Sequence, residues 1–261
     1  MSALLENKAG FSNRVAVITG AGEGSGYEIA RQLVHQGASV ILNDINVERA
    51  KQAAGEISAE GGKCIGTGGD VANAEAVRGL VNLAVEKFGR LDIAVANAGI
   101  SFYDDFFDVT PENFNRVVST NLGGTFFLAQ ASARQMRAQG SGGRILCMSS
   151  VLGSRAAPEA AVYGMTKRGI EMLTRNLGVA LAPYKITVNA LAPGATVTPR
   201  TLHDDPEYEA HWKAVTPTGR PAYPMDIAQA ALFFLAPETS HITGQTLLVD
   251  GGWTITSPWP G

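Results

Sequence analysis

The sequence predicts one α/β domain over residues 1–261, with helices covering both faces of a doubly wound, seven-stranded parallel sheet. Two observations favour this fold. Short apolar, β-branched runs alternate with longer segments of helical period, as is typical of parallel strands that are buried on both faces. In addition, no linker-like stretch and no repeat of solenoid period divides the chain. Right-handed crossovers between successive strands then produce the doubly wound sheet.

The elements follow in order along the chain. Apolar runs such as RVAVIT and ASVILN predict strands, which we expect at residues 14–19, 38–43, 63–66, 91–96, 144–148, 186–190 and 245–249. Segments of helical period lie between them, at residues 25–36, 47–59, 74–88, 111–138, 160–182 and 225–236. Gly37 and Pro183 end two of these helices, and Pro111 suits the first turn of a third.

Residues 195–223 break this alternation. They carry four prolines, His203, His211 and several charges, with only a short helical patch around residues 206–215. A long insertion in a compact α/β fold is usually functional and often covers a site, so we expect a substrate loop here. The alternative is a surface excursion without a role, and the two histidines are expected at the surface or in a pocket wall.

The composition argues against several classes of protein. The formal charge of −3 gives no reason to expect a nucleic-acid partner. No apolar stretch approaches the ~20 residues that cross a bilayer, and the first thirteen residues lack the pattern of a secretory signal. We therefore expect a cytoplasmic protein without a membrane partner. Cys64 and Cys147 have no metal-ligand spacing and are expected in the core.

A glycine-rich turn joins the first strand to the first helix, which predicts a Rossmann-type dinucleotide site. Glycines let the backbone approach a pyrophosphate, and the helix N-terminus offers free N–H groups to the phosphates. The residues of this turn expected to contact the cofactor are Gly20, Gly22, Glu23, Gly24, Ser25 and Gly26.

Asp44 follows the second strand, about twenty residues after the glycines. A carboxylate there accepts hydrogen bonds from the adenosine ribose and repels a 2′-phosphate. Glu23 adds a second negative charge, and no Arg or Lys occupies positions 43–46. The sequence therefore predicts NAD in preference to NADP, although Asp44 is also a suitable helix N-cap.

Tyr163 and Lys167 lie four residues apart in a predicted helix and therefore share one face. A nearby ammonium, together with a positive nicotinamide ring, favours the phenolate and makes the phenol a usable acid and base. Ser149 and Ser150 close a strand at the carboxyl edge, where open α/β sheets bind ligands. Alone, a tyrosine and a lysine four residues apart are common in helices, and a serine after a strand is common in turns and helix caps.

Taken in order, these motifs resemble the short-chain dehydrogenase/reductase family from about residue 14 to residue 253. The resemblance rests on TGxxxGxG at 19–26, Asp70-Val71, Asn97-Ala98-Gly99, Asn121, Ser150, Tyr163-xxx-Lys167, Pro193-Gly194 and Val249-Asp250-Gly251-Gly252. Ser25 and Ala96 depart from the usual residues, but neither departure removes a group that the chemistry needs.

The resemblance implies a role for each residue. Tyr163 would transfer the proton, Lys167 would lower its pKa and hold the nicotinamide ribose, and Asn121 would position a water. Ser150, thirteen residues before the tyrosine, would hold the substrate oxygen, with Ser149 as second choice. The remaining cofactor contacts would come from Asp70, Val71, Asn97, Ala98, Gly99, Pro193, Gly194 and Thr198. No metal is expected.

The expected substrate is a secondary alcohol or its ketone, such as a sugar, a polyol or a small cyclic alcohol. Its site is expected to include Ser150, Tyr163, Leu152, Glu159 and Trp212, with further aromatic residues nearby at Phe102, Tyr103 and Tyr208. Two alternatives stay open: an NADPH-dependent 3-oxoacyl-type carbonyl reductase, and an NAD-binding sensor without turnover. The resemblance also implies a homo-oligomer, a tetramer or dimer, in which the tail 253–261 reaches a neighbouring subunit.

Overall fold

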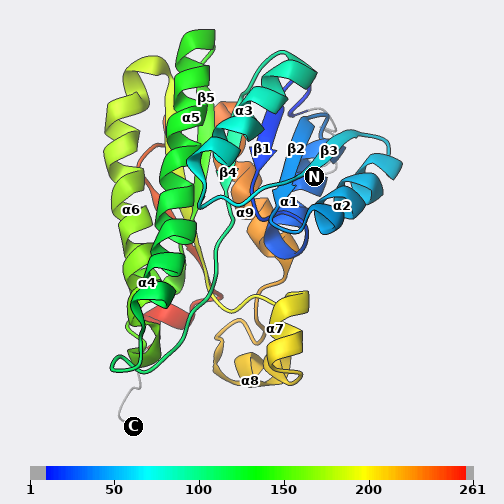
Figure 1. Cartoon of the computed structure of the whole chain (residues 1–261). Helices are drawn as coiled ribbons and strands as arrows, with labels where there is room; N and C mark the ends of the chain where they lie inside the picture. Colours follow the sequence, from blue (N-terminus) through cyan, green and yellow to red (C-terminus); the bar gives the residue numbers. More distant parts are fainter. Residues whose placement is uncertain (1–9, 257–261) are drawn as a thin grey trace.

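Seven parallel strands form one sheet in the order β3-β2-β1-β4-β5-β6-β7 (Figure 1). The computed structural model describes residues 10–256. Its strands are β1 (Val15–Ile18), β2 (Ser39–Asp44), β3 (Lys63–Gly68), β4 (Ile93–Ala96), β5 (Gly143–Met148), β6 (Ile186–Pro193) and β7 (Thr246–Val249). The predicted doubly wound α/β fold is confirmed, and the order of the strands reverses between β1 and β4.

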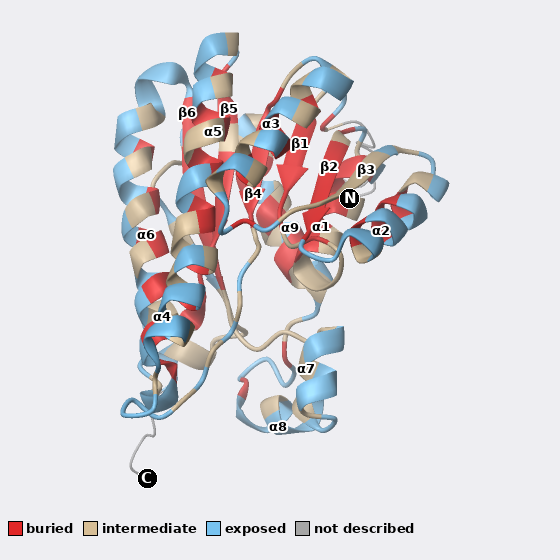
Figure 2. Ribbon diagram, in the orientation of Figure 1, coloured by how far each residue is buried: buried red, intermediate tan, exposed pale blue. Residues whose placement is uncertain are grey.

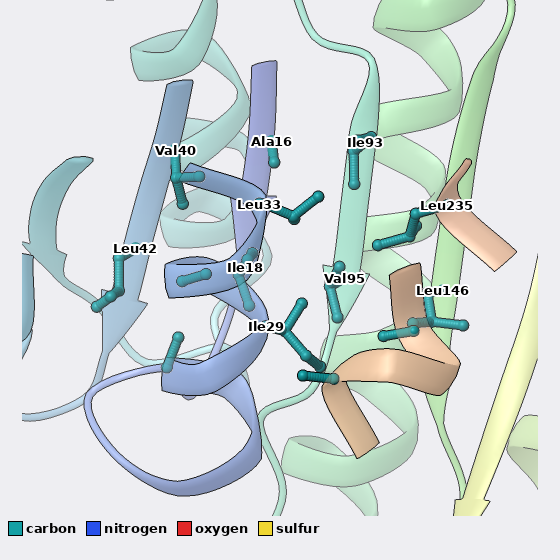
Figure 3. Close-up of a cluster of buried hydrophobic side chains, with 14 of the residues drawn as sticks. Ala16, Ile18, Ile29, Leu33, Val40, Leu42, Ile93, Val95, Leu146 and Leu235 are labelled. Carbon is teal, nitrogen blue, oxygen red and sulfur yellow. The ribbon is translucent and has the colours of Figure 1, made fainter. Parts of the chain in front are cut away.

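Two layers of helices cover the sheet and bury a separate apolar core on each face (Figure 2). One layer holds α1 (Gly24–His35), α2 (Val47–Ala59) and α9 (Pro224–Leu235). The other holds α3 (Ala74–Phe88), α5 (Gly124–Gln139) and α6 (Ala161–Leu181). Figure 3 shows Ile29 and Leu33 of α1 inserted among strand side chains such as Ile18 and Val95. Among the described helices, none is long and apolar enough to cross a membrane.

The segment expected as one helix over residues 111–138 is divided into three parts. It consists of α4 (Pro111–Val117), a π-helical segment (Val118–Gly123) and α5. The π segment holds the buried Asn121. Because the helical period continues through all three parts, the sequence pattern does not reveal the π turn, a feature that is frequent at functional sites.

The insertion at residues 195–223 contains two helices, α7 (Pro199–Asp204) and α8 (Tyr208–Val215), where one helical patch was expected. Its two ends are joined, since Thr196 and Ala222 form a parallel bridge and Val197 N donates to Ala222 O at 2.8 Å. The insertion is therefore a small structured unit on a closed base, and Figure 1 shows it below the carboxyl ends of the strands.

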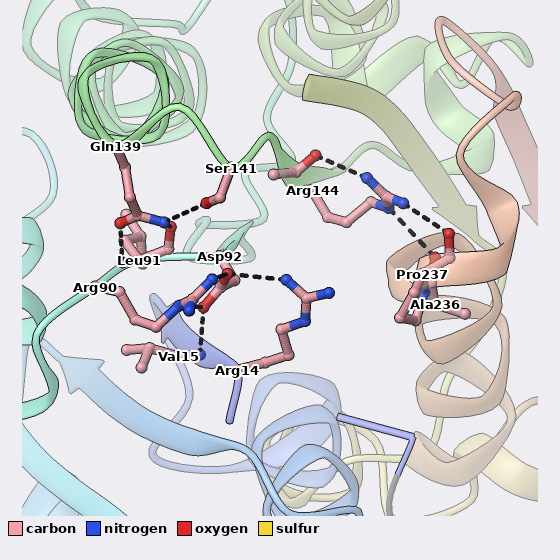
Figure 4. A network of polar contacts seen from close by, with 11 residues as sticks. Arg14, Val15, Arg90, Leu91, Asp92, Gln139, Ser141, Arg144, Ala236 and Pro237 are labelled. Atoms are coloured by element: carbon pink, nitrogen blue, oxygen red, sulfur yellow. Dashed lines mark hydrogen bonds and ion pairs between the residues drawn. The ribbon is translucent and has the colours of Figure 1, made fainter. Parts of the chain in front are cut away.

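A polar network stabilises the opposite, amino-terminal edge of the sheet (Figure 4). Asp92, which is buried, accepts hydrogen bonds from Val15 N at 3.0 Å, from Arg14 Nη1 at 3.1 Å and from Arg90 Nη2 at 2.6 Å. Because Asp92 satisfies a buried backbone N–H as well as two guanidinium groups, it fixes the start of β1 against the start of β4.

The two cysteines differ in burial. Cys147 on β5 is fully buried, as expected, whereas Cys64 is only half-buried because it lies on the edge strand β3. Expectations about the first nine residues and about the tail beyond residue 256 lie outside the described residues.

Candidate active site

The glycine turn after β1 is packed so closely that side chains would not fit. A Cβ at Gly20 would lie 2.6 Å from Ala98 Cα, and one at Gly26 would lie 2.4 Å from Asn97 Nδ2. Gly20 and Gly24 also have φ values of 60° and 65°, which favour glycine. The turn therefore presents bare backbone at the N-terminus of α1, as a pyrophosphate site requires.

Asn97 holds this turn against the end of β4. Its Nδ2 donates to Gly20 O at 2.7 Å and to Thr19 O at 3.0 Å, while Thr19 Oγ1 accepts from the N–H groups of Asn97 and Ala98 at 3.2 Å. Asn97 and Ala98 thus support the cofactor turn from behind, and the geometry gives the Asn97 amide a bracing role.

Asp44 lies at the end of β2, buried and directed at the glycine turn. Its Oδ2 accepts from Gly22 N at 3.2 Å, and its Oδ1 accepts from Asn46 N at 2.9 Å. The N-cap of α2 is Asn46, so the capping role considered for Asp44 belongs to its neighbour.

Arg49, which the sequence argument did not consider, contacts both predicted acidic residues. Its Nη2 lies 3.0 Å from Asp44 Oδ1, and its Nη1 lies 3.1 Å from Glu23 Oε1. The sequence has no cation at positions 43–46, but the first turn of α2 brings position 49 back over β2. The sequence signal was an arginine one helical turn after the N-cap.

Asp70 and Val71 lie on the loop after β3. The Asp70 carboxylate is exposed and accepts from Ala72 N at 2.9 Å. Val71 is buried beside Gly124 of α5, where an added Cβ would lie 2.9 Å from Val71 Cγ2. The pair therefore joins an exposed carboxylate to an apolar residue that anchors the loop after β3 on α5.

The catalytic candidates come together at the carboxyl edge of β4, β5 and α6. Lys167 Nζ donates to Met148 O at 2.8 Å and lies 5.5 Å from the centre of the Tyr163 ring. Ser150 caps a 3-10 turn (Val151–Gly153), and its Oγ accepts from Leu152 N at 3.2 Å. The Ser150 hydroxyl also lowers the pKa of the Tyr163 phenol.

The neighbouring Ser149 is engaged elsewhere. Its buried Oγ donates to Lys167 O and to Glu171 Oε1, each at 3.0 Å. These contacts tie the end of β5 to the interior of α6 and leave Ser150 as the serine that faces the phenol.

Burial has the largest effect on the pKa values of Tyr163 and Lys167. It raises the pKa of Tyr163, while the neighbouring hydroxyls of Ser150 and Ser101 and the charge of Arg200 lower it. Burial also lowers the pKa of Lys167 to about 8. For the chain without cofactor, desolvation outweighs the neighbours that favour the phenolate, and the lowering of the phenol pKa by Lys167 together with the nicotinamide ring stays a prediction.

Asn121 lies below this group and is fully buried in the π segment. Its Oδ1 accepts from Ile100 N at 2.8 Å, and its Nδ2 donates to Ile100 O at 3.0 Å and to Thr166 Oγ1 at 3.3 Å. Gly99 lies between the side chains of Asn121 and Lys167. A Cβ added to Gly99 would lie 3.3 Å from Asn121 Oδ1 and 3.5 Å from Lys167 Nζ. The structure therefore brings Asn121, Gly99 and Lys167 into one cluster.

The base of the insertion touches the cofactor turn. Thr198 is the N-cap of α7 and forms a capping box with Thr201. A Cβ at Gly24 would lie 3.4 Å from Thr198 Cγ2, so the two segments meet. Gly194 donates its N–H to Val249 O at 2.9 Å, which holds the end of β6 against β7.

Several aromatic side chains predicted for the substrate site lie close to one another. Tyr103 lies 6.1 Å from Tyr163, and Trp212 of α8 packs at 6.0 Å from Tyr208 and at 5.3 Å from Trp253, measured between ring centres. Arg155 stacks at 4.5 Å over Trp253 and donates to its carbonyl at 3.2 Å. These contacts join the insertion, the loop after β5 and the C-terminal segment into one wall.

The other two predicted substrate residues have different positions. Leu152 packs against α6, since a Cβ at Gly164 would lie 2.8 Å from its carbonyl oxygen. Glu159 has an exposed side chain, and its backbone carbonyl accepts from Asp104 N at 2.9 Å.

His211 is exposed and paired with Asp205 at 2.9 Å. Within residues 10–256, no three His, Cys, Asp or Glu side chains are grouped as metal ligands.

Comparisons with known proteins agree with this geometry. A family model described as Enoyl-(Acyl carrier protein) reductase matches residues 20–254. A short-chain dehydrogenase/reductase of Armillaria gallica is 40% identical over 248 residues, which cover 92% of this chain and 95% of that protein. An L-rhamnose 1-dehydrogenase (NAD(P)(+)) of Azotobacter vinelandii is 37% identical, with 92% and 96% covered. The solved structure of a short-chain type dehydrogenase/reductase from Mycobacterium marinum superposes with a TM-score of 0.91 at 32% identity, covering 97% and 100%.

Proposed function

The chain belongs to the short-chain dehydrogenase/reductase family and is an oxidoreductase, and within that family we propose an NAD-preferring dehydrogenase that oxidises a hydroxyl of a sugar or polyol to the carbonyl. One observation carries the proposal. A half-buried tyrosine, Tyr163, lies beside Lys167 and the hydroxyl of Ser150, at the sheet edge that also holds the glycine turn.

The residues present fit a nicotinamide dinucleotide. The glycine turn leaves bare backbone for the pyrophosphate, Asp44 offers a buried carboxylate to the adenosine ribose, and Thr198 lies across the turn at Gly24. When bound, the oxidised cofactor supplies a hydride acceptor and a positive ring. That positive charge favours the phenolate of Tyr163, in the same direction as the ammonium of Lys167.

The chain's own groups handle the proton. In oxidation, the Tyr163 phenolate accepts the proton of the substrate hydroxyl, and Ser150 Oγ donates a hydrogen bond that holds the same oxygen. Lys167, held by Met148 O, provides the positive charge nearest the ring. The side-chain amide of Asn121 accepts from Ile100 N through Oδ1 and donates to Ile100 O through Nδ2, which holds the loop after β4 in place.

The sugar assignment rests on the wall of the site and on the relatives. Tyr103, Tyr208 and Trp212 combine flat apolar faces with hydroxyl and N–H donors, and such faces suit the ring of a sugar. Proteins named L-rhamnose 1-dehydrogenase are 37% identical to this chain in Scheffersomyces stipitis and in Azotobacter vinelandii. We therefore infer an aldose or a related polyol as the substrate class.

Two alternatives follow from other observations. The family model's description and a relative named versicolorin reductase favour a carbonyl reductase, which would use the same residues in the reverse direction. Glu23 and Asp44 disfavour the NADPH that such a reductase commonly uses. A cofactor sensor without turnover would have no need of the group formed by Tyr163, Lys167 and Ser150.

We also propose that the protein is a homo-oligomer and that it acts in the cytoplasm. Apolar side chains are exposed on α6, namely Met165, Met172 and Val179. An exposed apolar stripe of this kind marks a protein interface. Both cysteines are free, which suits a reducing compartment.

The proposal is tested by following nicotinamide reduction on a panel of aldoses, polyols and secondary alcohols, L-rhamnose included, with NAD⁺ and NADP⁺ in parallel. We expect turnover that is faster with NAD⁺. Tyr163→Phe should reduce kcat by about 10²–10⁴-fold, because it removes the acid–base group. Cofactor binding, measured by NADH fluorescence, should persist in that variant. The control is Tyr184→Phe, which alters an exposed tyrosine beside Arg137.

Retained turnover in Tyr163→Phe would contradict the mechanism. A preference for NADP⁺ would contradict the role given to Asp44. NADH binding without turnover on any alcohol or ketone of the panel would favour the sensor.

A further inference from the structure

A buried carboxylate lies beneath the turn that carries Ser150. It belongs to Glu171 of α6, which is only 4% exposed. Glu171 follows Lys167 by four residues, so the two side chains share one face of the helix. Glutamates are almost never buried to this degree unless they are paired. The proton transfer described above does not use this group, and its burial therefore calls for another explanation.

The two oxygens of Glu171 have different partners. Oε1 accepts from the buried Ser149 Oγ at 3.0 Å, and Oε2 accepts from Arg168 Nη1 at 2.6 Å. The Arg168 side chain is 61% exposed, so the guanidinium reaches in from the surface. The carboxylate thus has an opposite charge on one side and a hydroxyl donor on the other, as a buried charge requires.

Both ends of the serine turn contact the same carboxylate oxygen. Ser149, directly before Ser150, donates to Glu171 Oε1. A Cβ at Gly153, where the turn ends, would lie 2.6 Å from that oxygen, so the Gly153 backbone lies directly against it. Between these two points, the N–H of Leu152 donates to Ser150 Oγ at 3.2 Å. One carboxylate oxygen therefore holds the short segment around Ser150 against α6 from both ends.

We propose that Glu171 is a positioning residue, which holds the turn of Ser150 on α6 and thereby keeps the Ser150 hydroxyl beside the Tyr163 phenol. The inference rests on the proposed function, in which these two groups share the substrate oxygen. Tyr163 belongs to α6, whereas Ser150 belongs to the turn, so the link between the two elements sets the distance between their hydroxyls. Glu171 acts on the reaction only through Ser150.

The first measurement is hydrogen exchange of the backbone amides of the turn in the full-length protein. The N–H groups of Leu152 and Gly153 donate to Ser150 Oγ and Ser150 O, so they are protected while the turn is held. Glu171→Ala should speed their exchange by roughly tenfold or more, because a hydrogen bond to a charged group is lost. Amides of β2, which is remote from α6, should exchange at an unchanged rate.

Three further variants keep the inference falsifiable. Ser149→Ala removes the same hydrogen bond from the other side and should also speed exchange in the turn. Glu171→Gln keeps an oxygen that accepts from Ser149 and should restore part of the protection. The matched control is Thr174→Val, which removes a buried hydroxyl that donates to Ile170 O at 2.8 Å within α6. The melting temperature of each variant reports whether it is folded.

The second measurement is the pH profile of kcat. Glu171→Ala should lower kcat by about tenfold and move its rise to higher pH, because a displaced Ser150 no longer lowers the pKa of Tyr163. In a Ser150→Ala background, the same change should lower kcat by less than about twofold, since residues that act through one another are not additive. Thr174→Val should leave the position of the rise unchanged.

The outcomes separate the inference from the proposed function. A wild-type protein without turnover would refute the proposed function, and the exchange rates would still decide whether Glu171 holds the turn. Unchanged exchange in both Glu171→Ala and Ser149→Ala would overturn the inference. Equal losses of kcat with and without Ser150, or a loss that is uniform across pH, would also overturn it.

Discussion

The hydroxyl of Tyr163 is influenced by groups from three segments of the chain. Burial raises its pKa, whereas Ser150 after β5, Ser101 after β4 and Arg200 in α7 lower it. Ser101 was not among the predicted site residues, because nothing in its local sequence distinguishes it from other loop serines. Its position becomes apparent only when the loop after β4 is placed over α6.

Ser101→Ala should slow oxidation at neutral pH. The Ser101 hydroxyl lowers the pKa of Tyr163, so its removal should raise that pKa and move the rise of kcat with pH to higher pH. A hydrogen bond contributes about 0.5–1.5 kcal/mol, which corresponds to roughly a two- to tenfold decrease in kcat on the low-pH side of this rise. The measurement is a pH profile of kcat for the variant, the wild type and the control Ser240→Ala, whose side chain is exposed. A uniform decrease at all pH values would argue against an effect on Tyr163.

At the scale of elements, the hydrophobic pattern of the sequence predicts the regular strands and helices. The π segment and the position of Arg49 depend instead on contacts between elements, which a local pattern does not contain. The apolar runs and the helical period predicted all seven strands and the helices of both layers. The short helix α7 was missed, although Thr198 and Pro199 form an N-cap and a first-turn proline, because four prolines suggested an irregular loop.

Trp212 joins α8 to the C-terminal segment. Its ring packs on Trp253, which is in turn held by Arg155. Trp212→Ala should raise KM for the alcohol roughly tenfold, because such an aromatic pair contributes about 0.5–1.5 kcal/mol beyond the buried area. KM for NAD⁺ should change little, since the glycine turn is untouched. Limited proteolysis should show faster cleavage within residues 195–223, and unchanged cleavage together with an unchanged KM would refute the attachment.

At the scale of the whole molecule, the two edges of the sheet have different tasks. The carboxyl edge gathers the glycine turn, Asp44, Tyr163 and Lys167, which form the proposed site. The amino edge has the Asp92 network, whose groups are directed towards one another (Figure 4). This separation explains why substitutions at the amino edge are expected to affect stability before they affect chemistry.

The exposed face of α6 carries a stripe of apolar side chains. Met165, Met172 and Val179 are 49%, 54% and 80% exposed and recur every seven residues, so they share one side of the helix. Burial of this stripe against a second copy removes apolar surface from water. Light scattering should give a dimer or tetramer for the wild type and a smaller species for Met172→Glu/Val179→Glu, while Lys51→Glu on α2 should leave the mass unchanged. A monomeric wild type would show that the stripe does not mediate self-association, and an unchanged mass in the double variant would assign the interface to another face.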